Sequence, residues 1–347
     1  MHNRLTGLDL LRSIIMIFGP VFHASMLYNG AWGFDYQLYK NPWIVDALNL
    51  THPFRMELFF MISGFFSSLL IARKGSEHFI ESRIKRVLKP TFWAVIITLP
   101  IIASEMYFLF GDRRLGDYLS YKHLWFLIVL SQISLLLMSA PDKINTLARN
   151  LADTLNKMRW VSVFTLFLTV IYASVALSKA VSMFLPRAFL NITQLAATLQ
   201  YLPFFMAGMI LFFVKKNIAA KSALFLVLLY FIWFLANVHF DGKHKLTFKV
   251  AEVVAVLSVC MALFFIFKNL KIKQSTAITA LSKLALPFYL THLPILIFLG
   301  WLGSEYEISR NPLLFLSYVV TLNVVLSFIA SVSIRKSPVI SRFLGLA

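Results

Sequence analysis

Apolar stretches of roughly twenty residues recur along nearly the whole chain, and they limit the folds open to it. A stretch of that length crosses a bilayer as a helix, because a helix satisfies its backbone hydrogen bonds internally. Composition agrees: 59% of the residues are hydrophobic and 14% are charged, whereas soluble domains carry about 25% charged residues. The sequence therefore predicts an all-α, polytopic integral membrane bundle.

We expect ten membrane-spanning helices in a single transmembrane domain over residues 1–347, because no soluble domain or internal repeat interrupts the series. Boundaries read from hydropathy alone are approximate by a few residues. The predicted spans are 8–29, 52–72, 91–110, 123–140, 160–180, 198–214, 222–239, 248–267, 285–303 and 313–334.

The formal net charge of +18 has a simple source in a membrane protein. Lys and Arg collect in cytoplasmic loops by the positive-inside rule. With the N-terminus in the cytoplasm, the inside segments hold 21 of the 33 Lys and Arg residues and the outside segments and flanks hold 10. The asymmetry predicts that both termini are cytoplasmic. Membrane lipids are the expected partners and nucleic acid is not, and part of the charge can serve anionic head groups or a polyanionic ligand.

Metal and thiol chemistry find little support in the sequence. Cys260 is the single cysteine, so no disulfide or thiolate metal site forms within one chain. The sequence has no HExxH spacing and no Gly-rich phosphate loop, and no GxSxG nucleophile motif. We therefore predict no metal site and no bound cofactor.

The first span carries ionisable residues that a lipid-facing helix would exclude. Arg12 and His23 are eleven residues apart, which places both on one helix face, roughly 16 Å apart along the axis. Ionisable groups in a membrane usually face the protein interior or a cavity and mark function, and histidine suits proton transfer near neutral pH. The alternative is that Arg12 pairs with Asp9 and His23 is a satisfied interior histidine.

The second span adds Arg55 and Glu57, at the depth predicted for His23. A carboxylate beside a histidine can hold the ring and stabilise the imidazolium. Residues two apart on a helix point away from each other. Arg55 and Glu57 therefore each need a partner on another helix or on a ligand.

Three further features have both a functional and a structural interpretation. Arg83 and Arg86 lie in a basic stretch that can hold phosphates, although such stretches are usually topology signals. His123 and His292 are isolated histidines, of which His292 lies within a span, and isolated histidines are more often structural. The aromatic segment 30–51 can cover a cavity or form part of an interfacial aromatic belt.

Several motifs occur in order over nearly the whole chain. They are LDLLR ending at Arg12, ten residues and then His23; FRMELFFMISGFF; RIKR; HLWFL; YLPFFMAGM at 201–209; and FYLTHLPIL. Together these motifs resemble the membrane acyltransferase 3 family. FRMELFFMISGFF and HLWFL are also similar to its periplasmic glucan succinyltransferase branch.

The resemblance implies a ten-helix bundle in a bacterial inner membrane that moves an acyl group across it. The donor would be cytoplasmic acyl-coenzyme A, and the acceptor a hydroxyl of a periplasmic or cell-envelope glycan. Arg12 and His23 match the essential pair of the family, and Arg83 and Arg86 match its basic cytoplasmic motif. The identity of the acyl group (acetyl, succinyl or longer), the glycan, the oligomeric state and the existence of a covalent acyl-enzyme stay open.

On this basis we assign hypothetical roles. His23 is the catalytic base and Glu57 its orienting carboxylate. Arg55 is the partner of an oxyanion or of a succinyl carboxylate. The candidates for coenzyme A binding are Arg12, Arg83 and Arg86. The competing hypotheses are a transporter or flippase for an envelope glycan or lipid precursor, in which the same residues would form a substrate or proton path, and a non-catalytic assembly partner.

Overall fold

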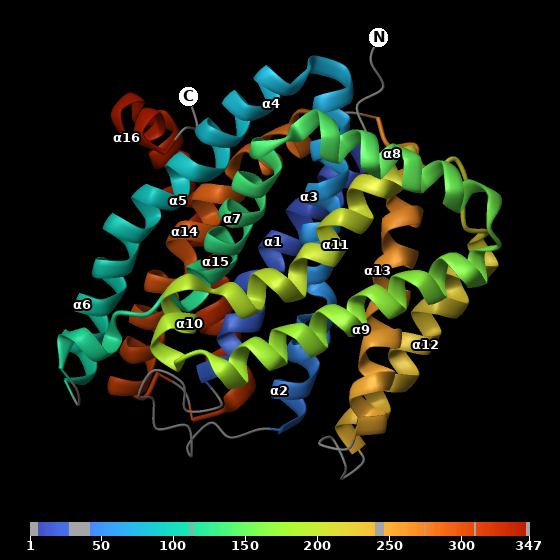
Figure 1. Ribbon diagram of the computed structural model, residues 1–347. Coiled ribbons are helices and arrows are strands. Elements are labelled where there is room, and N and C mark those ends of the chain that lie inside the picture. Colours follow the sequence, from blue (N-terminus) through green and yellow to red (C-terminus); the bar gives the residue numbers. More distant parts are fainter. Residues whose placement is uncertain are drawn as a thin grey trace. The chain divides into compact units, whose positions relative to one another are not determined.

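The computed structural model describes residues 6–27, 42–111, 114–239, 246–273, 275–308 and 310–344 (Figure 1). These residues are almost entirely helical and contain no strand. Ten helices among them are long and apolar enough to cross a membrane. The prediction of an all-α bundle of ten spans is therefore confirmed. The spans are Thr6–Ala24, Trp43–Lys74, Ser76–Phe110, Lys122–Ser139, Trp160–Phe184, Leu195–Phe213, Ala220–His239, Thr247–Asn269, Thr276–Glu305 and Pro312–Lys336.

The helices carry the labels of Figure 1. In chain order they are α1 (Thr6–Leu27), α2 (Pro42–Asn49), α3 (His52–Lys74), α4 (Ser76–Arg83), α5 (Lys89–Trp93), α6 (Leu99–Phe110), α7 (Trp125–Ser139), α8 (Pro141–Lys157), α9 (Trp160–Phe184), α10 (Arg187–Thr193), α11 (Leu195–Phe213), α12 (Ala220–His239), α13 (Leu246–Asn269), α14 (Thr276–Glu305), α15 (Pro312–Lys336) and α16 (Pro338–Phe343). Short 3₁₀ turns cover Leu115–Tyr118 and Lys122–Leu124.

Side-chain caps fix where the last helices begin. Ser275 accepts from the backbone N–H of Ile278 at the start of α14. Asn311 accepts from two backbone N–H groups at the start of α15, where Pro312 is the first helical residue. Such caps satisfy N–H groups that have no partner within the helix, and proline at the first position loses no hydrogen bond.

The predicted connection 73–90 is mostly helical, and proline explains its irregular geometry. The backbone forms a wide π turn at Ile84–Leu88, inside this connection, and another at Ala94–Thr98, inside the predicted span 91–110. Pro90 and Pro100 each follow one of these turns by two residues. A proline has no N–H and clashes with the carbonyl four residues earlier, which lies inside the preceding turn, and a wider turn relieves this clash.

The predicted connection 141–159 also contains a helix, α8. Its apolar residues recur at three- and four-residue spacing, which gives one apolar face and one polar face. The buried side includes Ala148, Ala152 and Leu155. The helix is polar overall because it carries charged residues on its other face, and hydropathy therefore does not mark it as a span.

The described residues group into two compact units that interleave along the sequence. The first unit contains residues 1–8, 53–87 and 126–272, and the second contains 9–52, 88–125 and 273–347. The prediction of a single domain over the whole chain stays a prediction. Residues 30–41 of the aromatic segment 30–51 lie outside the described residues.

Within the first unit, α3 is buried along nearly its whole length, and two glycines set its approach to α11. A Cβ atom on Gly64 would lie 1.8 Å from the carbonyl oxygen of Phe205. A Cβ atom on Gly208 would lie 1.8 Å from the carbonyl oxygen of Met61. Only glycine permits this reciprocal backbone contact, which is a common way to pack helices in membranes.

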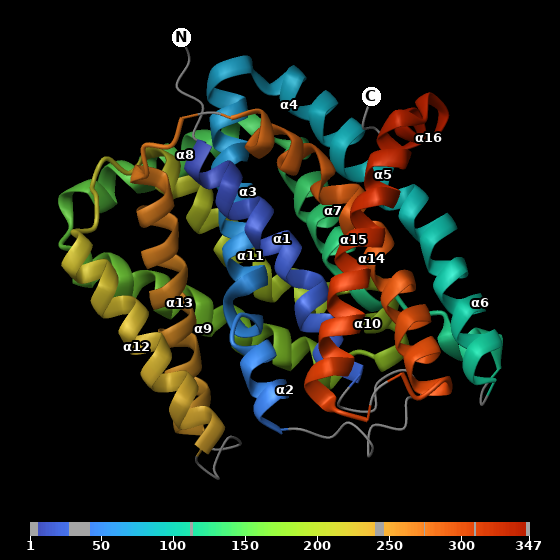
Figure 2. The same ribbon diagram turned by 180° about the vertical axis from the view of Figure 1, so that it is seen from behind.

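Within the second unit, α14 and α15 lie side by side as a hairpin (Figure 2). Gly303 lets the ring of Phe315 approach α14, since a Cβ there would come within 2.7 Å of that ring. The apolar core around this hairpin also receives residues of α1, α2 and α6. Its buried members are Ala24, Leu27, Ile44, Ile102, Ala103, Met106, Tyr118, Leu293, Leu296, Ile297, Phe315 and Val319.

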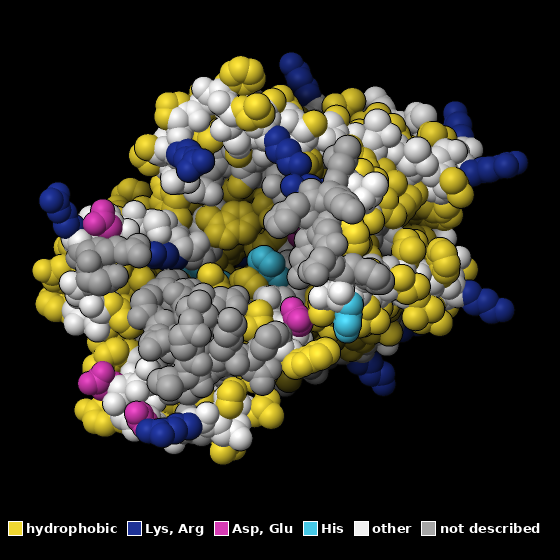
Figure 3. All heavy atoms as spheres, turned by 90° about the horizontal axis from the view of Figure 1, so that it is seen from below, with side chains coloured by type: hydrophobic (Ala, Val, Ile, Leu, Met, Phe, Trp, Pro, Cys, Tyr) yellow, Lys and Arg dark blue, Asp and Glu magenta, His cyan; other side chains and the backbone are white. Residues whose placement is uncertain are grey.

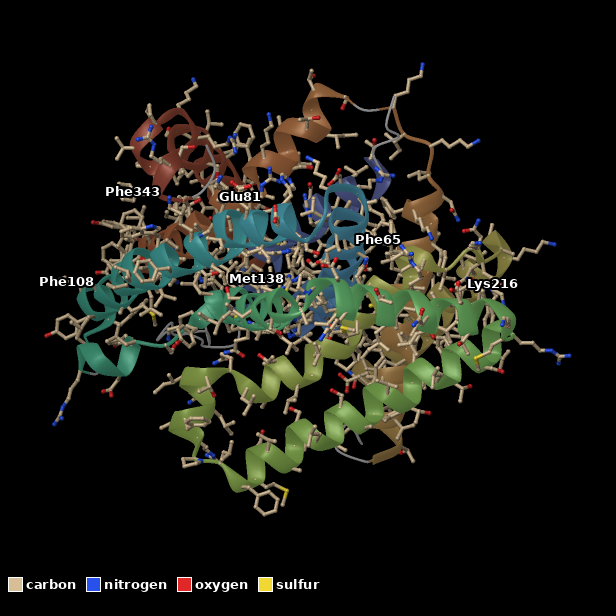
Figure 4. The ribbon with its side chains drawn as sticks, turned by 45° about the horizontal axis from the view of Figure 1, so that its top comes forward. Phe65, Glu81, Phe108, Met138, Lys216 and Phe343 are labelled. Carbon is tan, nitrogen blue, oxygen red and sulfur yellow. The ribbon has the colours of Figure 1, made fainter. Side chains whose placement is uncertain are left out.

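Large apolar side chains are also exposed on the helices. Figure 3 shows hydrophobic side chains at many places on the one face in view. Phe108 on α6 is 82% exposed, and Phe343 on α16 is also exposed; both lie on the outside of the second unit (Figure 4). Apolar exposure on this scale is costly in water and favourable in lipid. The chain is a multi-pass membrane protein.

Candidate functional site

The candidate site is built on two helices of the second unit that run parallel. The hydroxyl oxygens of Ser13 and Ser282 lie 3.2 Å apart, and Nδ1 of His23 lies 2.8 Å from Nε2 of His292. Both contacts join residues 269 positions apart. A constant offset means that α1 and α14 point the same way and stay in register. This agrees with ten alternating spans, in which α1 is the first and α14 the ninth.

The shared register of α1 and α14 also sets the distance between the two levels at which they make contact. Ten residues separate the serine level from the histidine level on each helix, which is about 15 Å along the axis. Arg12 lies next to Ser13 at one level, and His23 lies at the other. The predicted separation of Arg12 and His23 along one helix therefore holds, because α1 is helical throughout, including at Pro20.

A chain of hydrogen bonds fixes the ring of His23. Nδ1 of His292 lies 2.6 Å from the carbonyl oxygen of Tyr289. A carbonyl only accepts hydrogen bonds, so His292 carries its proton on Nδ1 and, when neutral, a lone pair on Nε2. Nδ1 of His23 must then donate to that lone pair. This leaves the lone pair of neutral His23 on Nε2, the position from which it can accept a proton.

The ring geometry supports this bond. The His23 and His292 ring planes differ by 11°, and their centroids are 5.0 Å apart. The nitrogen–nitrogen distance of 2.8 Å is much shorter than the centroid distance. The rings therefore meet edge to edge in nearly one plane, as an N–H···N bond requires, and are not stacked face to face.

His123 is the third histidine of this site. Its ring centroid lies 5.0 Å from that of His292 and 6.2 Å from that of His23, nearly perpendicular to both. Tyr289 donates its hydroxyl to the backbone carbonyl of His123. Within the described residues, neither ring nitrogen of His123 has a hydrogen-bond partner, and the residue is only 4% exposed.

Arg12 has a partner on its own helix. Its guanidinium lies 3.3 Å from a carboxylate oxygen of Asp9, and its side chain is 33% exposed. The pairing that we gave as the structural alternative is thus present. A guanidinium has five N–H donors and this side chain is partly exposed, so the pairing and a ligand-binding role are compatible.

Arg55, Glu57, Arg83 and Arg86 belong to the first unit, whereas His23 belongs to the second. Arg55 and Glu57 are both buried on α3. Arg83 donates to the hydroxyl of Ser67 at 2.6 Å and lies over the ring of Phe79. Arg86 is exposed. A contact of His23 with Arg55 or Glu57, and phosphate binding by the two arginines, stay predictions.

The sequence offered His123 and His292 only as isolated histidines, and their joint position with His23 was missed. The three histidines are far apart in the sequence, and no short motif contains two of them. The available signal was that His292 is an ionisable residue inside a span. Among the described residues, no group of three His, Cys, Asp or Glu side chains is arranged to hold a metal ion.

Comparison with known proteins gives a family and named relatives. Residues 5–332 match the acyltransferase 3 family, which is described as an acyltransferase domain. A relative from Escherichia coli O1:K1, named Glucans biosynthesis protein C, is 26% identical over 319 residues, covering 84% of this chain and 82% of the relative. A relative of the same name from Escherichia coli O157:H7 strain EC4115 is 26% identical over 316 residues, with the same coverage. No solved structure matches the chain.

Proposed function

The chain belongs to the acyltransferase 3 family, and from this premise we propose that it moves an acetyl or succinyl group from cytoplasmic acyl-coenzyme A to a hydroxyl of a cell-envelope glycan. Membrane acyltransferase activity follows from the family and the ten apolar helices. The relatives named for glucan biosynthesis support a glycan as the acceptor. The donor, its side of the membrane and the periplasmic position of the acceptor are part of the proposal.

The observation that carries the proposal is the hydrogen-bond chain from the Tyr289 carbonyl through His292 to His23. Acyl transfer to a hydroxyl needs a base with a fixed lone pair. The hydrogen-bond chain keeps that lone pair on Nε2 of His23. When Nε2 takes the hydroxyl proton, Nδ1 still donates to His292, and this bond stabilises the imidazolium.

The donor would bind toward the Arg12 level of α1. Coenzyme A carries phosphates, which guanidinium groups bind in a bidentate manner. Arg12 is partly exposed and lies about 16 Å along the helix from His23. Such a spacing suits an extended donor that reaches from its phosphates to its thioester. In the proposal Arg86, which is exposed, and Arg83 hold further phosphates.

Arg55 and Glu57 keep the roles proposed from the sequence. Both are buried in α3, where a charged side chain requires compensation. Arg55 would bind an oxyanion or the free carboxylate of a succinyl group. Glu57 would act as an additional orienting carboxylate for His23, which already has His292 as a hydrogen-bond partner.

The proposed location is the bacterial inner membrane with both termini in the cytoplasm. An even number of spans returns the chain to its starting side. In the second unit, Arg335 near the end of α15 donates to the carbonyl of Lys283 near the start of α14. The start of α14 also contacts Ser13 of α1. These contacts support a common side for the start of α1 and the end of α15.

A transfer assay tests the proposal. The purified protein in proteoliposomes receives acyl-coenzyme A labelled in the acyl group, together with envelope glucan. We expect label on the glucan with the wild type and a loss of about a hundredfold or more with His23→Ala. Full transfer by a correctly inserted His23→Ala variant would remove His23 as the base. Absence of transfer by the wild type would refute the proposed donor or acceptor.

A further inference from the structure

His123 has an unusual environment for a buried histidine. Both ring nitrogens lie in the protein interior without a hydrogen-bond partner in the described part of the chain. The carbonyl of Tyr289 is the nearest backbone acceptor to the ring, but the contact lacks the geometry of a hydrogen bond, and this carbonyl already accepts from His292. Burial of a polar group without a partner costs free energy. A ligand that supplies the missing hydrogen bond would recover that cost.

The backbone next to His123 is strained and is held in place by its surroundings. Lys122, directly before it, has a φ of +46°, which lies in the left-handed region and is uncommon for residues other than glycine. On the other side, the N–H of Leu124 bonds to the carbonyl of Tyr121 in a short 3₁₀ turn. The Tyr289 hydroxyl secures the His123 carbonyl. Strained backbone that is held by its surroundings often occurs at functional sites.

The His123 ring lies beside the pair formed by His23 and His292. His123 lies nearly perpendicular to the plane shared by His23 and His292, with its centroid 6.2 Å from that of His23. Nε2 of His23 lies on the ring edge away from His292, so contact with both Nε2 and the His123 ring requires a group with two separate polar atoms. The hydroxyl and the carbonyl of an acyl transfer reaction form such a group.

We propose that His123 is a further catalytic residue, which donates a ring N–H to the carbonyl oxygen of the acyl group during transfer. This inference rests on the proposed function and assigns a role to a residue outside the predicted site. Donors aimed at a developing oxyanion stabilise the transition state most effectively in a site without water. A neutral imidazole can act as such a donor.

The step balances as follows. Nε2 of His23 takes the proton of the glycan hydroxyl, and the hydroxyl oxygen forms a bond to the thioester carbon. The carbonyl oxygen becomes negative and accepts the hydrogen bond from His123. When the carbonyl reforms, the carbon–sulfur bond breaks. The thiolate then takes the proton from Nε2 of His23, which yields the ester, free coenzyme A thiol and neutral His23.

His123 fits the donor role better than a second base. One lone pair is sufficient to take the hydroxyl proton, and the hydrogen-bond chain assigns it to His23. No carboxylate in the described residues contacts the His123 ring in a hydrogen bond or ion pair that would stabilise a cation there. A neutral ring carries one N–H and one lone pair, and its N–H is the group that the carbonyl oxygen requires.

The test compares three substitutions in the proteoliposome assay. His123→Phe and His123→Leu remove the N–H, and His123→Gln retains an amide N–H of similar reach. We expect kcat to fall by roughly a hundred- to a thousandfold for Phe and Leu, with KM for donor and acceptor changed less than about threefold. The kcat of His123→Gln should be at least tenfold higher than that of the Phe and Leu variants. Thermal unfolding in detergent accompanies each measurement.

Other results would overturn the inference. One is an unchanged kcat in stable His123→Phe or His123→Leu protein. Another is an increase in KM alone, which would assign His123 to ground-state binding. A third is equal loss in all three variants together with lower thermal stability, which would make the role structural. If the Phe and Leu variants do not accumulate, low kcat in stable His123→Gln protein rejects the donor role.

The pH profile separates His123 from the base. The His123→Phe variant should keep the acidic limb of the wild-type kcat profile, because the assigned base, His23, is still present. Loss of that limb would make His123 the base. Wild-type protein that transfers no label would refute the proposed function itself. Wild-type transfer with no effect of the His123 substitutions would refute only this inference.

Discussion

Nδ1 of His23 and Nε2 of His292 lie 2.8 Å apart, although 269 positions separate the two residues in the sequence. The contact joins the first and ninth spans, and Ser13 and Ser282 repeat the same offset ten residues earlier. His292 in turn donates to the carbonyl of Tyr289. The ring orientation of the assigned base thus depends on a helix near the opposite end of the chain.

Removal of His292 should weaken catalysis without removing the base. In His292→Ala, Nδ1 of His23 loses its acceptor, and the neutral ring can then carry its proton on either nitrogen. We expect kcat to fall by about tenfold to a thousandfold, since a histidine in the wrong tautomer cannot act as a base. Steady-state transfer kinetics measure this loss.

The control for this prediction is His292→Gln, because its side-chain carbonyl can still accept from Nδ1 of His23. We expect it to recover part of kcat. An unchanged kcat in stable His292→Ala protein would contradict the orienting role. A loss of thermal stability in both variants, with equal activity per folded molecule, would indicate that His292 only supports packing.

Substitution of Arg12 should affect use of the donor. If Arg12 binds a coenzyme A phosphate, Arg12→Ala loses a charged hydrogen bond, and KM for acyl-coenzyme A should rise roughly ten- to a hundredfold. Asp9→Asn is the matched control, because it breaks the pair with Arg12 and keeps the guanidinium. Equal loss of stability in both variants with unchanged KM would reduce Arg12 to a structural partner of Asp9.

Substitutions of Arg83 and Arg86 should differ in their effect on stability. Arg83 is bound to Ser67 and Phe79 within the first unit, whereas Arg86 is exposed. Arg83→Ala and Ser67→Ala should each lower the free energy of unfolding by about 1–3 kcal/mol, because a partly buried charged hydrogen bond is lost. Arg83→Ala and Arg86→Ala should both raise KM for the donor, but Arg86→Ala should leave stability unchanged. A stable Arg83→Ala protein with raised KM would show that Arg83 binds the donor and has no structural role.

Alanine at Gly64 or Gly208 should destabilise the first unit. The new Cβ would lie 1.8 Å from a carbonyl oxygen of the facing helix, so α3 and α11 must move apart. We expect a loss of about 1–3 kcal/mol or more, as for other overpacked cores. The control is Gly19→Ala on α1, where a Cβ meets nothing within 4 Å. Thermal stability in detergent that is equal for Gly64→Ala and Gly19→Ala would show that α3 and α11 tolerate the extra atoms.

Some structural details depend on local rules that the sequence contains but that hydropathy does not reveal. Pro90 follows the π turn at Ile84–Leu88, which allows the helix to continue where a connection was predicted. Pro100 follows the π turn at Ala94–Thr98, which lies within the predicted span 91–110. The amphipathic helix α8 is too polar to register as a span. Both features follow from residue types, yet hydropathy averaged over a span length conceals them.

The sequence by itself determined the ten helices and the common face of Arg12 and His23. Both depend on interactions within one segment, because a backbone in hydrocarbon must satisfy its own hydrogen bonds. Tertiary structure alone decided that His292 holds His23 and that His123 lies beside them. Lipid is as apolar as the helix surfaces, so hydropathy does not specify which helices pack together. That choice depends on shape, small residues and polar contacts between distant segments.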